Sequence, residues 1–561
     1  METTNVKPKT QKTNAVEANP FLSTNRDNNA KNGGTLLRNL HLYFCQFCGA
    51  TSIHGIQYLG ERGRYIVEKL VWIAIITTVS GLCLFLISKT YVKWQTSPVI
   101  VTFSTTEIPI SNIPFPAVTI CPQTKFDPNK FNFTGTVLKK LKKQAISQTE
   151  ENLFNTLSLS CNSIMEFIDL FGMHGVDKTL DHLSILFFAS VAPPLDPTGA
   201  TSVRWLGKEL EIEDSLSATF TSEGICYTFN MLPYEDILSS ADDFVSNNKY
   251  EKHSARQWSL QDGYDKRANF DTYPRRTFLP GISGGLMVDA LYTNHSHLDY
   301  LCDESLQGYK VIILHHPSEL PDMGKHFRLS LDEAVYVGIK PTMITVSPAL
   351  LPYSPEKRKC YFAEEKPLLM YKLYTQQNCL SECLANFTLL KCGCLAFYMP
   401  TFNNTPICGA GSLTCILESK VKYLESSVAT DIGGEKCGCL PSCTSLSYEV
   451  ETSQAVWNWR EMFNVFIALG MSDSVPSREE SHFSRLVVYY KDLQFLTSER
   501  NELYGYVDFF SNVGGLLGLF IGFSVTSVVE IIYFLTLRLV CNVKMYGKKY
   551  WSGEIESLKA E

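Results

Sequence analysis

The fold is decided by residues 507–540, which read Val507-Asp-Phe-Phe-Ser-Asn-Val-Gly-Gly-Leu-Leu-Gly-Leu-Phe-Ile-Gly-Phe-Ser-Val-Thr-Ser-Val-Val-Glu-Ile-Ile-Tyr-Phe-Leu-Thr-Leu-Arg-Leu-Val540. No charged side chain lies between Asp508 and Glu530. The hydrocarbon core of a bilayer is crossed by about 20 such residues in a helix. We therefore predict a membrane-spanning helix over residues 507–540.

This span is unusually rich in small and polar residues, namely Gly514, Gly515, Gly518, Gly522, Ser511, Asn512, Ser524, Thr526 and Ser527. A tightly packed anchor with Gly-x-x-x-Gly contacts is one interpretation. Two separate polar clusters exceed what helix packing requires, so we favour a helix that lines a pore. Asp508 and Glu530 bracket the span, and ionisable groups at membrane depth often mark an ion path. We expect these two carboxylates to concentrate cations at the two ends of the pore.

A second apolar run, Leu70–Ile87, predicts another span over residues 70–91. Basic residues are enriched in cytoplasmic loops, and they flank both predicted spans on one side: Arg62, Arg64, Lys69, Arg538, Lys544, Lys548 and Lys549. The sequence thus predicts a two-span plasma-membrane protein with both termini in the cytoplasm. The predicted segments are a cytoplasmic N-terminus 1–69, a span 70–91, an extracellular domain 92–506, a span 507–540 and a cytoplasmic C-terminus 541–561.

Composition narrows the class further. The chain has a net charge of −7, and 45% of its residues are hydrophobic. Its length of 561 residues is more than one ordinary domain needs. Its basic residues are scattered, which gives no indication of nucleic-acid binding. Residues 1–36 are rich in Asn, Thr and Lys, and we expect a disordered tail there.

The cysteines indicate an oxidising compartment for the predicted extracellular domain. Of 18 cysteines, Cys45, Cys48, Cys83 and Cys541 lie in the predicted tails or spans, and the other fourteen lie in residues 92–506. Ten of them fall in residues 360–443. Zinc is the rival explanation, but no His lies in that cluster, so we predict a stack of disulfides that stiffens it. Four glycosylation sequons add support, at Asn132, Asn294, Asn386 and Asn403.

Other motifs allow more than one interpretation. Gly281-Ile-Ser283-Gly-Gly285 matches a nucleophile pattern, but that pattern needs a strand before it and a helix after it, and Pro280 with the paired glycines favours a turn. The pair His315-His316 is unsuited to one metal if it lies on a strand, because adjacent side chains point to opposite faces. His54-Gly55 on its own favours a turn, and Cys45-x-x-Cys48 favours two free thiols. We predict that the chain is not an enzyme and holds no metal.

For secondary structure, the sequence predicts a strand in the Pro-punctuated segment that ends at Cys121, a helical region over 137–185 and a strand at Gly224–Asn230. Residues 240–285 are polar and read as an insertion. A last strand, 484–497, is expected to feed directly into the second span.

Together these residues resemble the degenerin/epithelial sodium channel family, most closely its insect pickpocket branch. The resemblance covers about residues 40–540 and rests on His54-Gly55, Phe115-Pro-Ala-Val-Thr-Ile-Cys121, Gly224-Ile-Cys-Tyr-Thr-Phe-Asn230, Tyr374-Thr-Gln-Gln-Asn-Cys-Leu-Ser-Glu-Cys383, Cys392-Gly-Cys-Leu-Ala-Phe-Tyr-Met-Pro400, Cys437-Gly-Cys-Leu-Pro-Ser-Cys443 and Gly518-Leu-Phe-Ile-Gly-Phe-Ser524.

The resemblance implies two transmembrane helices that flank a large disulfide-rich α+β extracellular domain of the palm, thumb, finger, knuckle and β-ball type. It implies a homo- or heterotrimer in the lipid bilayer that conducts Na⁺ without a cofactor, is blocked by amiloride, and is gated by an extracellular ligand or by force. The selectivity filter falls on Gly522, Phe523 and Ser524. The degenerin position near the gate falls on Ser511, beside Asn512, and the cytosolic gating motif falls on His54-Gly55.

The family's cysteine framework implies six pairs: Cys121–Cys226, Cys360–Cys443, Cys379–Cys439, Cys383–Cys437, Cys392–Cys415 and Cys394–Cys408. The two cysteines that remain in the predicted extracellular domain are then expected to form a seventh pair, Cys161–Cys302. One departure concerns Phe523, where better-known members carry a small residue, so selectivity and amiloride potency do not carry over directly. If the filter is lined by backbone, Phe523 can point away from the pore.

Three other classes of protein share some of these features. An ATP-gated purinergic receptor shares two spans and a Cys-rich domain, but the cysteine order and the Gly-x-Ser block argue against it. A two-span scavenger-type receptor would bind ligand without conducting, and would not need a Gly- and Ser-rich second span. An ectoenzyme would depend on Ser283.

Overall fold

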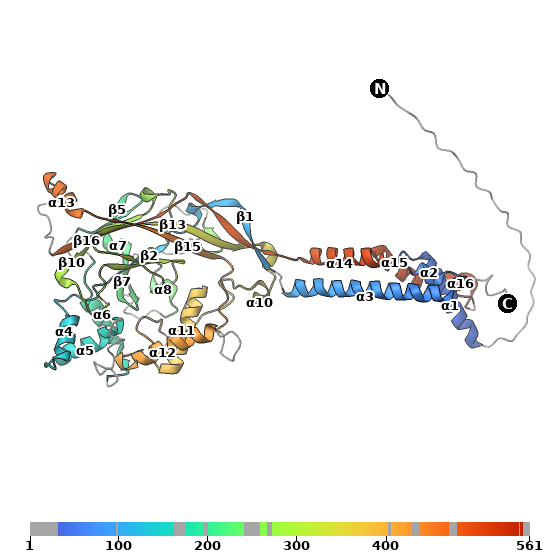
Figure 1. Ribbon diagram of the computed structural model, residues 1–561, viewed down its shortest axis with the longest axis horizontal. Coiled ribbons are helices and arrows are strands. Elements are labelled where there is room, and N and C mark those ends of the chain that lie inside the picture. The colour runs from blue at the N-terminus through green and yellow to red at the C-terminus, as the bar shows by residue number, and fades with distance from the viewer. Residues whose placement is uncertain are drawn as a thin grey trace, which may run out of the picture. The chain divides into compact units, whose positions relative to one another are not determined.

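The computed structural model describes residues 32–96, 99–161, 176–195, 200–240, 258–265, 272–303, 305–401, 405–428, 437–470, 480–548 and 550–553. The chain divides into two compact units (Figure 1). One consists of Met1–Thr96 together with Tyr504–Glu561, and the other is Ser97–Leu503. The division falls at residues 96 and 503, within a few residues of the limits 92 and 506 predicted for the extracellular domain.

In the first unit, the first predicted span lies inside one long helix, α3 (Ile66–Thr96). This helix is long and apolar enough to cross a membrane. At 1.5 Å per residue, its 31 residues extend about 46 Å, so it continues beyond a hydrocarbon core of about 30 Å. The predicted limits 70–91 describe only its central part.

The second predicted span is not one helix, which corrects the prediction. It consists of α14 (Tyr506–Ile521), α15 (Val525–Tyr533), a π-helical turn η10 (Phe534–Arg538) and α16 (Leu539–Tyr546). Val525–Tyr546 is long and apolar enough to span, while Tyr506–Ile521 is a shorter apolar helix. Apolar length alone predicted a single span and took no account of the helix stop and start signals at residues 522–524. α14 runs alongside α3 (Figure 1).

Two further helices of this unit precede α3: α1 (Asn32–Ala50) and α2 (Gln57–Gly60). The predicted tail 1–36 is therefore wrong for residues 32–36, which belong to α1, while residues 1–31 lie outside the described residues. The rings of Tyr43 and Phe47 pack on Phe534, with centroids 5.9 and 5.4 Å away. Helix α1 is thus held against the second half of the second span.

The larger unit is built on an eight-stranded mixed sheet. Its strand order is β1 (Val99–Pro109), β17 (Gln494–Glu502), β13 (Glu333–Val346), β16 (Ser481–Tyr490), β10 (Leu286–Asn294), β4 (Ser202–Trp205) and β5 (Lys208–Leu210), and β15 (Ser445–Val456) also pairs with β13.

The expected last strand, 484–497, is two strands, β16 and β17. Both run parallel to β13, with Ile339 opposite Tyr490 and Ile344 opposite Ser498. Lys491, Asp492 and Leu493 separate the two strands, so the expectation of one continuous strand is wrong. Only Leu503, Tyr504 and Gly505 separate β17 from α14, so the sheet does lead directly into the second span along the chain.

A second sheet has five strands in the order β12 (Phe327–Leu329), β11 (Tyr309–Leu314), β2 (Ala117–Pro122), β7 (Gly224–Phe229) and β6 (Leu216–Thr221). Strands β2 and β7 are the two strands expected around Cys121 and Gly224–Asn230. Both sheets contribute to one buried core, in which Phe115 packs edge-on to Trp205 and Tyr490.

The expected helical region 137–185 is not continuous. It contains α4 (Phe133–Leu141) and α5 (Gln148–Leu157), separated by a turn at Lys143 with φ of 52°. Asn132 and Ser147 cap the two helices by accepting hydrogen bonds from backbone amides. Residues 162–175 lie outside the described residues, as do residues 241–257 and 266–271 of the polar segment expected at 240–285.

The disulfide-rich part of this unit contains the helices α11 (Gln376–Cys392) and α12 (Leu413–Val428), which lie together in Figure 1. The hydroxyls of Thr388 and Ser419 hydrogen-bond between them over 3.1 Å. The remaining short elements are β3 (Thr179–Leu180), α6 (Leu186–Val191), α7 (Ile212–Ser215), α8 (Tyr234–Ile237), β8 (Trp258–Ser259), β9 (Gly263–Tyr264), α10 (Pro355–Arg358), β14 (Ile407–Cys408) and α13 (Trp459–Ala468).

Seven disulfides link the fourteen cysteines of the larger unit: Cys121–Cys226, Cys161–Cys302, Cys360–Cys443, Cys379–Cys439, Cys383–Cys437, Cys392–Cys415 and Cys394–Cys408. Six of these are the pairs that the resemblance implied, and Cys161–Cys302 is the pair expected from the two cysteines that remained. The chain thus combines two apolar helical regions near its ends with one large mixed α/β domain that disulfides cross-link.

Candidate functional site

The break in the second span is centred on the three predicted filter residues, Gly522, Phe523 and Ser524. Gly522 ends α14 in the left-handed conformation, with φ of 71°. Its amide donates to the Gly518 carbonyl and the Phe523 amide donates to the Leu517 carbonyl, at 3.0 and 3.2 Å. A glycine that closes a helix in this way is common, because a Cβ is strained at positive φ.

A new helix starts at once, because Ser524 is the N-cap of α15. Its hydroxyl accepts from the Ser527 amide, and the Ser527 hydroxyl accepts from the Ser524 amide. The Ser524 hydroxyl also lies 2.7 Å from that of Thr526. Non-helical backbone at membrane depth is tolerated only where protein buries it or water lines it, and its oxygens are suited to replace part of an ion's hydration shell.

The His54-Gly55 segment lies against this break. The His54 amide donates to the carbonyl of Ile521, the last residue of α14, over 2.8 Å. A Cβ added to Gly522 would come within 2.6 to 2.8 Å of three atoms of the His54 ring. The structure therefore brings together the predicted gating motif and the predicted filter, which the sequence separates widely.

The turn that carries His54 is fixed to the first span. Gly55 has φ of 80°, and a Cβ there would lie 3.2 Å from the Ile76 side chain. Tyr58 stacks on Trp72 of α3, with ring centroids 4.2 Å apart. The segment between α1 and α3 thus contacts both the first span and the break in the second span.

Glu530, one of the two predicted pore-end carboxylates, is held by the same segment. Its Oε2 accepts from the Ser52 amide at 3.1 Å and from the Ser52 hydroxyl at 3.2 Å. The Ser52 and Ser527 hydroxyls are 2.8 Å apart, and Ser527 is fully buried. No local pattern marks Ser52 in the sequence, because its partners Ser527 and Glu530 belong to a distant part of the chain.

The other predicted pore-end carboxylate, Asp508, lies in the first turn of α14, where it accepts from the Gly505 amide at 3.2 Å. Asn512 donates to the Asp508 carbonyl at 2.9 Å, and Ser511 beside it is exposed. Asp508, Ser511 and Asn512 therefore lie at the start of α14, apart from Glu530 on α15.

Aromatic side chains join the two spans beside this start of α14. Trp94 of α3 stacks on Phe509, with ring centroids 4.8 Å apart, and meets Tyr506 edge-on at 5.4 Å. Tyr91 also contacts Phe509. Paired aromatic rings contribute energy beyond the area they bury, so they hold the two helices together here.

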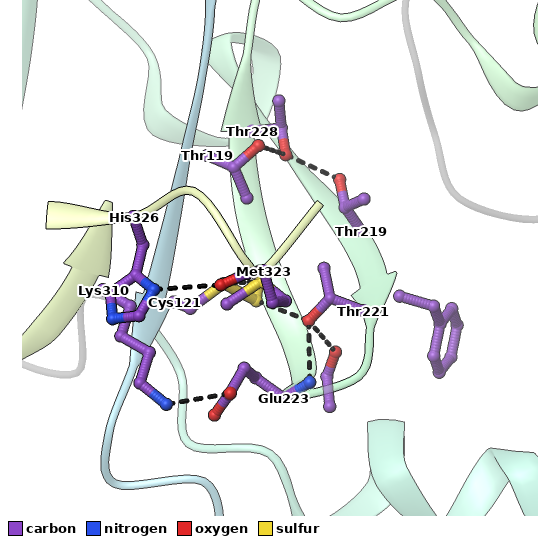
Figure 2. Close-up of a disulfide and its surroundings, with 12 residues drawn as sticks. Thr119, Cys121, Thr219, Thr221, Glu223, Thr228, Lys310, Met323 and His326 are labelled. Carbon is purple, nitrogen blue, oxygen red and sulfur yellow. Dashed lines mark hydrogen bonds and ion pairs between the residues drawn. A yellow bond between two sulfur atoms is a disulfide. The ribbon is translucent and has the colours of Figure 1, made fainter. Parts of the chain in front are cut away.

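In the larger unit, the disulfide Cys121–Cys226 ties β2 to β7 next to a ladder of threonines (Figure 2). The hydroxyls of Thr119, Thr228 and Thr219 are linked by two hydrogen bonds of 2.9 Å. Figure 2 also shows Glu223 reaching Lys310 below the disulfide.

Glu223 belongs to a buried charge cluster that sequence reasoning missed. Its carboxylate is 2.6 Å from the Lys125 amine and 2.8 Å from the Lys310 amine, and Lys310 lies 3.0 Å from Asp303. Burial alone would raise the pKa of Glu223, but the charges and hydrogen bonds of the two lysines outweigh it and lower the pKa to about 2. Lys125, Glu223 and Lys310 lie far apart in the sequence, so no local sequence pattern indicates that they form ion pairs.

Several sequence motifs do not form sites. Ser283 lies in a short 3₁₀ turn (Ile282–Gly284) that is followed by strand β10 instead of the helix that a nucleophile elbow requires. His315 follows β11 and accepts from the Tyr448 amide at 3.2 Å, while His316 is buried and bonded to Ser318. In α1, Cys45 and Cys48 are free thiols.

Three sequon asparagines lie in the described part of the chain. Asn132 is exposed and caps α4, Asn294 is half-buried and accepts from Ser296, and Asn386 is half-buried on α11. Asn403 lies outside the described residues. Glycosylation at these four positions stays a prediction.

Comparison with known proteins identifies the class. A family model described as amiloride-sensitive sodium channel matches residues 47–534. Pickpocket protein 28 of Drosophila melanogaster is 29% identical over 511 residues, 88% of this chain and 78% of the relative. The sodium channel protein Nach of the same species is 22% identical over 529 residues, 89% of this chain and 88% of that one. The bile acid-sensitive ion channel of Mus musculus is 23% identical over 512 residues, 87% of each chain.

The matched family is one of ion channels, not of enzymes. Its model spans most of the sequence. This chain therefore belongs to the amiloride-sensitive sodium channel family, which is the degenerin/epithelial sodium channel family that its motifs resemble.

Proposed function

We propose that this chain is a subunit of a trimeric, sodium-selective, amiloride-sensitive cation channel, opened by an extracellular ligand or by force. The observation that carries the proposal is the break at Gly522–Ser524, where the second span stops being helical and the His54 turn lies against it. A span that served only as an anchor would have no use for a helix stop and a helix start in its middle.

In the proposed pore, Na⁺ loses part of its hydration shell at the break. Backbone oxygens near Gly522 and the hydroxyl of Ser524 are the groups able to replace that water. Asp508 and Glu530 attract cations toward the two ends of the path. Since the Ser524 hydroxyl also caps α15, the proposed filter is fixed to the helix that follows it.

The proposed topology places both termini in the cytoplasm of the plasma membrane and the disulfide-rich unit outside. Basic residues beside the two spans support this orientation. Disulfides form in oxidising compartments, which agrees with an extracellular location for the larger unit. Homo- or heteromeric partners would be related subunits.

Two-electrode recording from oocytes tests the proposal, with Ser511 replaced by Phe to hold the gate open and by Ala as the size control. We expect a standing Na⁺ current with Ser511→Phe that amiloride blocks, and none with Ser511→Ala. Surface labelling establishes delivery of both variants.

If Ser511→Phe reaches the surface and passes no current, co-expression with related subunits separates two explanations. Current that appears only with a partner supports an obligate heteromer. No current with any partner would contradict the channel proposal and favour a non-conducting receptor of the scavenger type.

A further inference from the structure

Two histidine side chains face each other at one end of the large sheet. Nδ1 of His295 lies 3.0 Å from Nε2 of His482. His295 opens the short turn η7 (His295–His297) that follows β10, and His482 is the second residue of β16. The antiparallel register pairs Thr293 with His482, so the chain brings the two rings together through its strand pairing.

The ring of His482 is fixed from its other side by Asp332. Its Nδ1 lies 2.7 Å from the Asp332 carboxylate. The same carboxylate accepts from the Trp459 indole at 2.7 Å and lies 3.4 Å from the Phe483 amide. These contacts leave Nε2 as the nitrogen of His482 that faces His295.

This arrangement has the features of a metal site. A metal-bound histidine commonly gives its second nitrogen to a carboxylate, which orients the ring and raises its basicity. Two nitrogens on one tetrahedral ion, each about 2.0–2.1 Å from it, lie about 3.3 Å apart. The observed distance of 3.0 Å between the two nitrogens is close to this value. After a small tilt of the rings, an ion can therefore replace the proton of the hydrogen bond between them.

The rings are also accessible. His295 is exposed, and 19% of the His482 side chain is exposed. Imidazole nitrogens suit Zn²⁺ and Cu²⁺, whereas Mg²⁺ and Ca²⁺ prefer oxygen ligands. In the described part of the chain, no three His, Cys, Asp or Glu side chains form a metal-binding group, so an ion here would have two protein ligands and complete its shell with water.

We propose that His295 and His482 form a binding site for a divalent late transition-metal ion, Zn²⁺ or Cu²⁺, with Asp332 as a positioning residue. This proposal replaces the expectation from the sequence that the chain holds no metal. The ion would link the end of β10 to β16. Because Asp332 also holds Trp459, the site is connected to the first residue of α13. The site does not depend on whether the chain conducts ions.

Calorimetric titration of ZnCl₂ into the full-length protein in detergent tests the proposal, using an affinity tag without histidine. We expect saturable binding that His295→Ala and His482→Ala each abolish. His297→Ala, which alters the same turn, should leave it intact. Asp332→Asn should weaken binding about 10- to 100-fold without abolishing it.

Thermal unfolding without metal shows whether each variant is folded. A variant that is unfolded is left out of the comparison of metal affinities. A second readout uses Cu²⁺, whose electron paramagnetic resonance spectrum should show coupling to two nitrogens in the wild type and lose it in His295→Ala. Absence of Zn²⁺ binding to the wild type would overturn the proposal. So would binding that survives both histidine substitutions and is lost instead on replacing His41 and Cys45, which lie 3.8 Å apart in α1.

Discussion

The amide of His54 donates a hydrogen bond to the carbonyl oxygen of Ile521 over 2.8 Å. The last carbonyls of a helix have no partner within it, so this contact satisfies a group that the break in the second span exposes. The segment before the first span therefore belongs structurally to the break, and the predictions for this region can be tested by changing either side of the contact.

Replacing Gly522 by Ala should be disruptive. The residue has φ of 71°, and an added Cβ would meet the His54 ring at 2.6 to 2.8 Å. The left-handed conformation alone costs an Ala about 1–2 kcal/mol, and the clash adds to this. We expect a lower thermal unfolding midpoint and loss of current. Gly81→Ala is the matched control, since a Cβ at Gly81 in α3 meets no atom within 4 Å. Equal behaviour of the two variants would contradict the prediction.

Replacing Ser524 by Ala should alter ion selectivity, if the chain conducts as proposed. The change removes the N-cap of α15, worth about 1 kcal/mol, and deletes a hydroxyl that faces the break. Phe523→Ala is the control, because a filter lined by backbone does not use that ring. We expect a shift in reversal potential under mixed Na⁺ and K⁺ for Ser524→Ala alone. A shift only with Phe523→Ala would show that the ring, not the cap, governs selectivity.

Ser52 and Glu530 should be energetically coupled. The carboxylate of Glu530 accepts from both the amide and the hydroxyl of Ser52, and residues in one hydrogen-bond network show coupling of about 0.5–3 kcal/mol. A double-mutant cycle of Ser52→Ala and Glu530→Gln, read from unfolding free energies, should give a value in that range. Ser88 provides the control, because its hydroxyl donates to the Phe85 carbonyl within α3. The effects of Ser88→Ala and Glu530→Gln on the unfolding free energy are expected to be additive.

Features fixed by local sequence or by a cysteine framework could be predicted, while features made by distant contacts could not. The strands around Cys121 and Gly224 and the long first span follow from residue patterns that are complete within one segment. The pairing of Cys360 with Cys443 follows from the resemblance, not from spacing.

The missed features each depended on a second part of the chain or on a short signal inside an apolar run. Gly522 and Ser524 are predicted filter residues, but the helix stop and the helix start that they provide are short signals inside a long apolar run, which on its own predicts one continuous helix. Asp332 gave no signal at all, because its partners Trp459 and His482 are brought to it only by the folded sheet.

The buried cluster around Glu223 makes stability depend on pH. The pKa of Glu223 is lowered to about 2 because Lys125 and Lys310 outweigh the cost of burial, whereas a glutamate in an unfolded chain titrates near about 4.3. A lowered pKa means that the folded state binds the proton less tightly than the unfolded state. The contribution of the Glu223 carboxylate to the free energy of unfolding is therefore fully present above about pH 4.3 and is lost as the pH falls toward about 2.

Replacing Glu223 by Gln should remove this contribution, of the order of 3 kcal/mol above about pH 5, and leave two buried lysines with less compensation. The thermal midpoint of the variant should therefore lie below that of the wild type at pH 7, and the gap should narrow as the pH falls from about 5 to about 2. Glu451→Gln is the control, because Glu451 forms an exposed ion pair with Lys491 and exposed pairs contribute little. A gap for Glu223→Gln that stays constant over this pH range would mean that the carboxylate is not stabilised by its lysines in the folded protein.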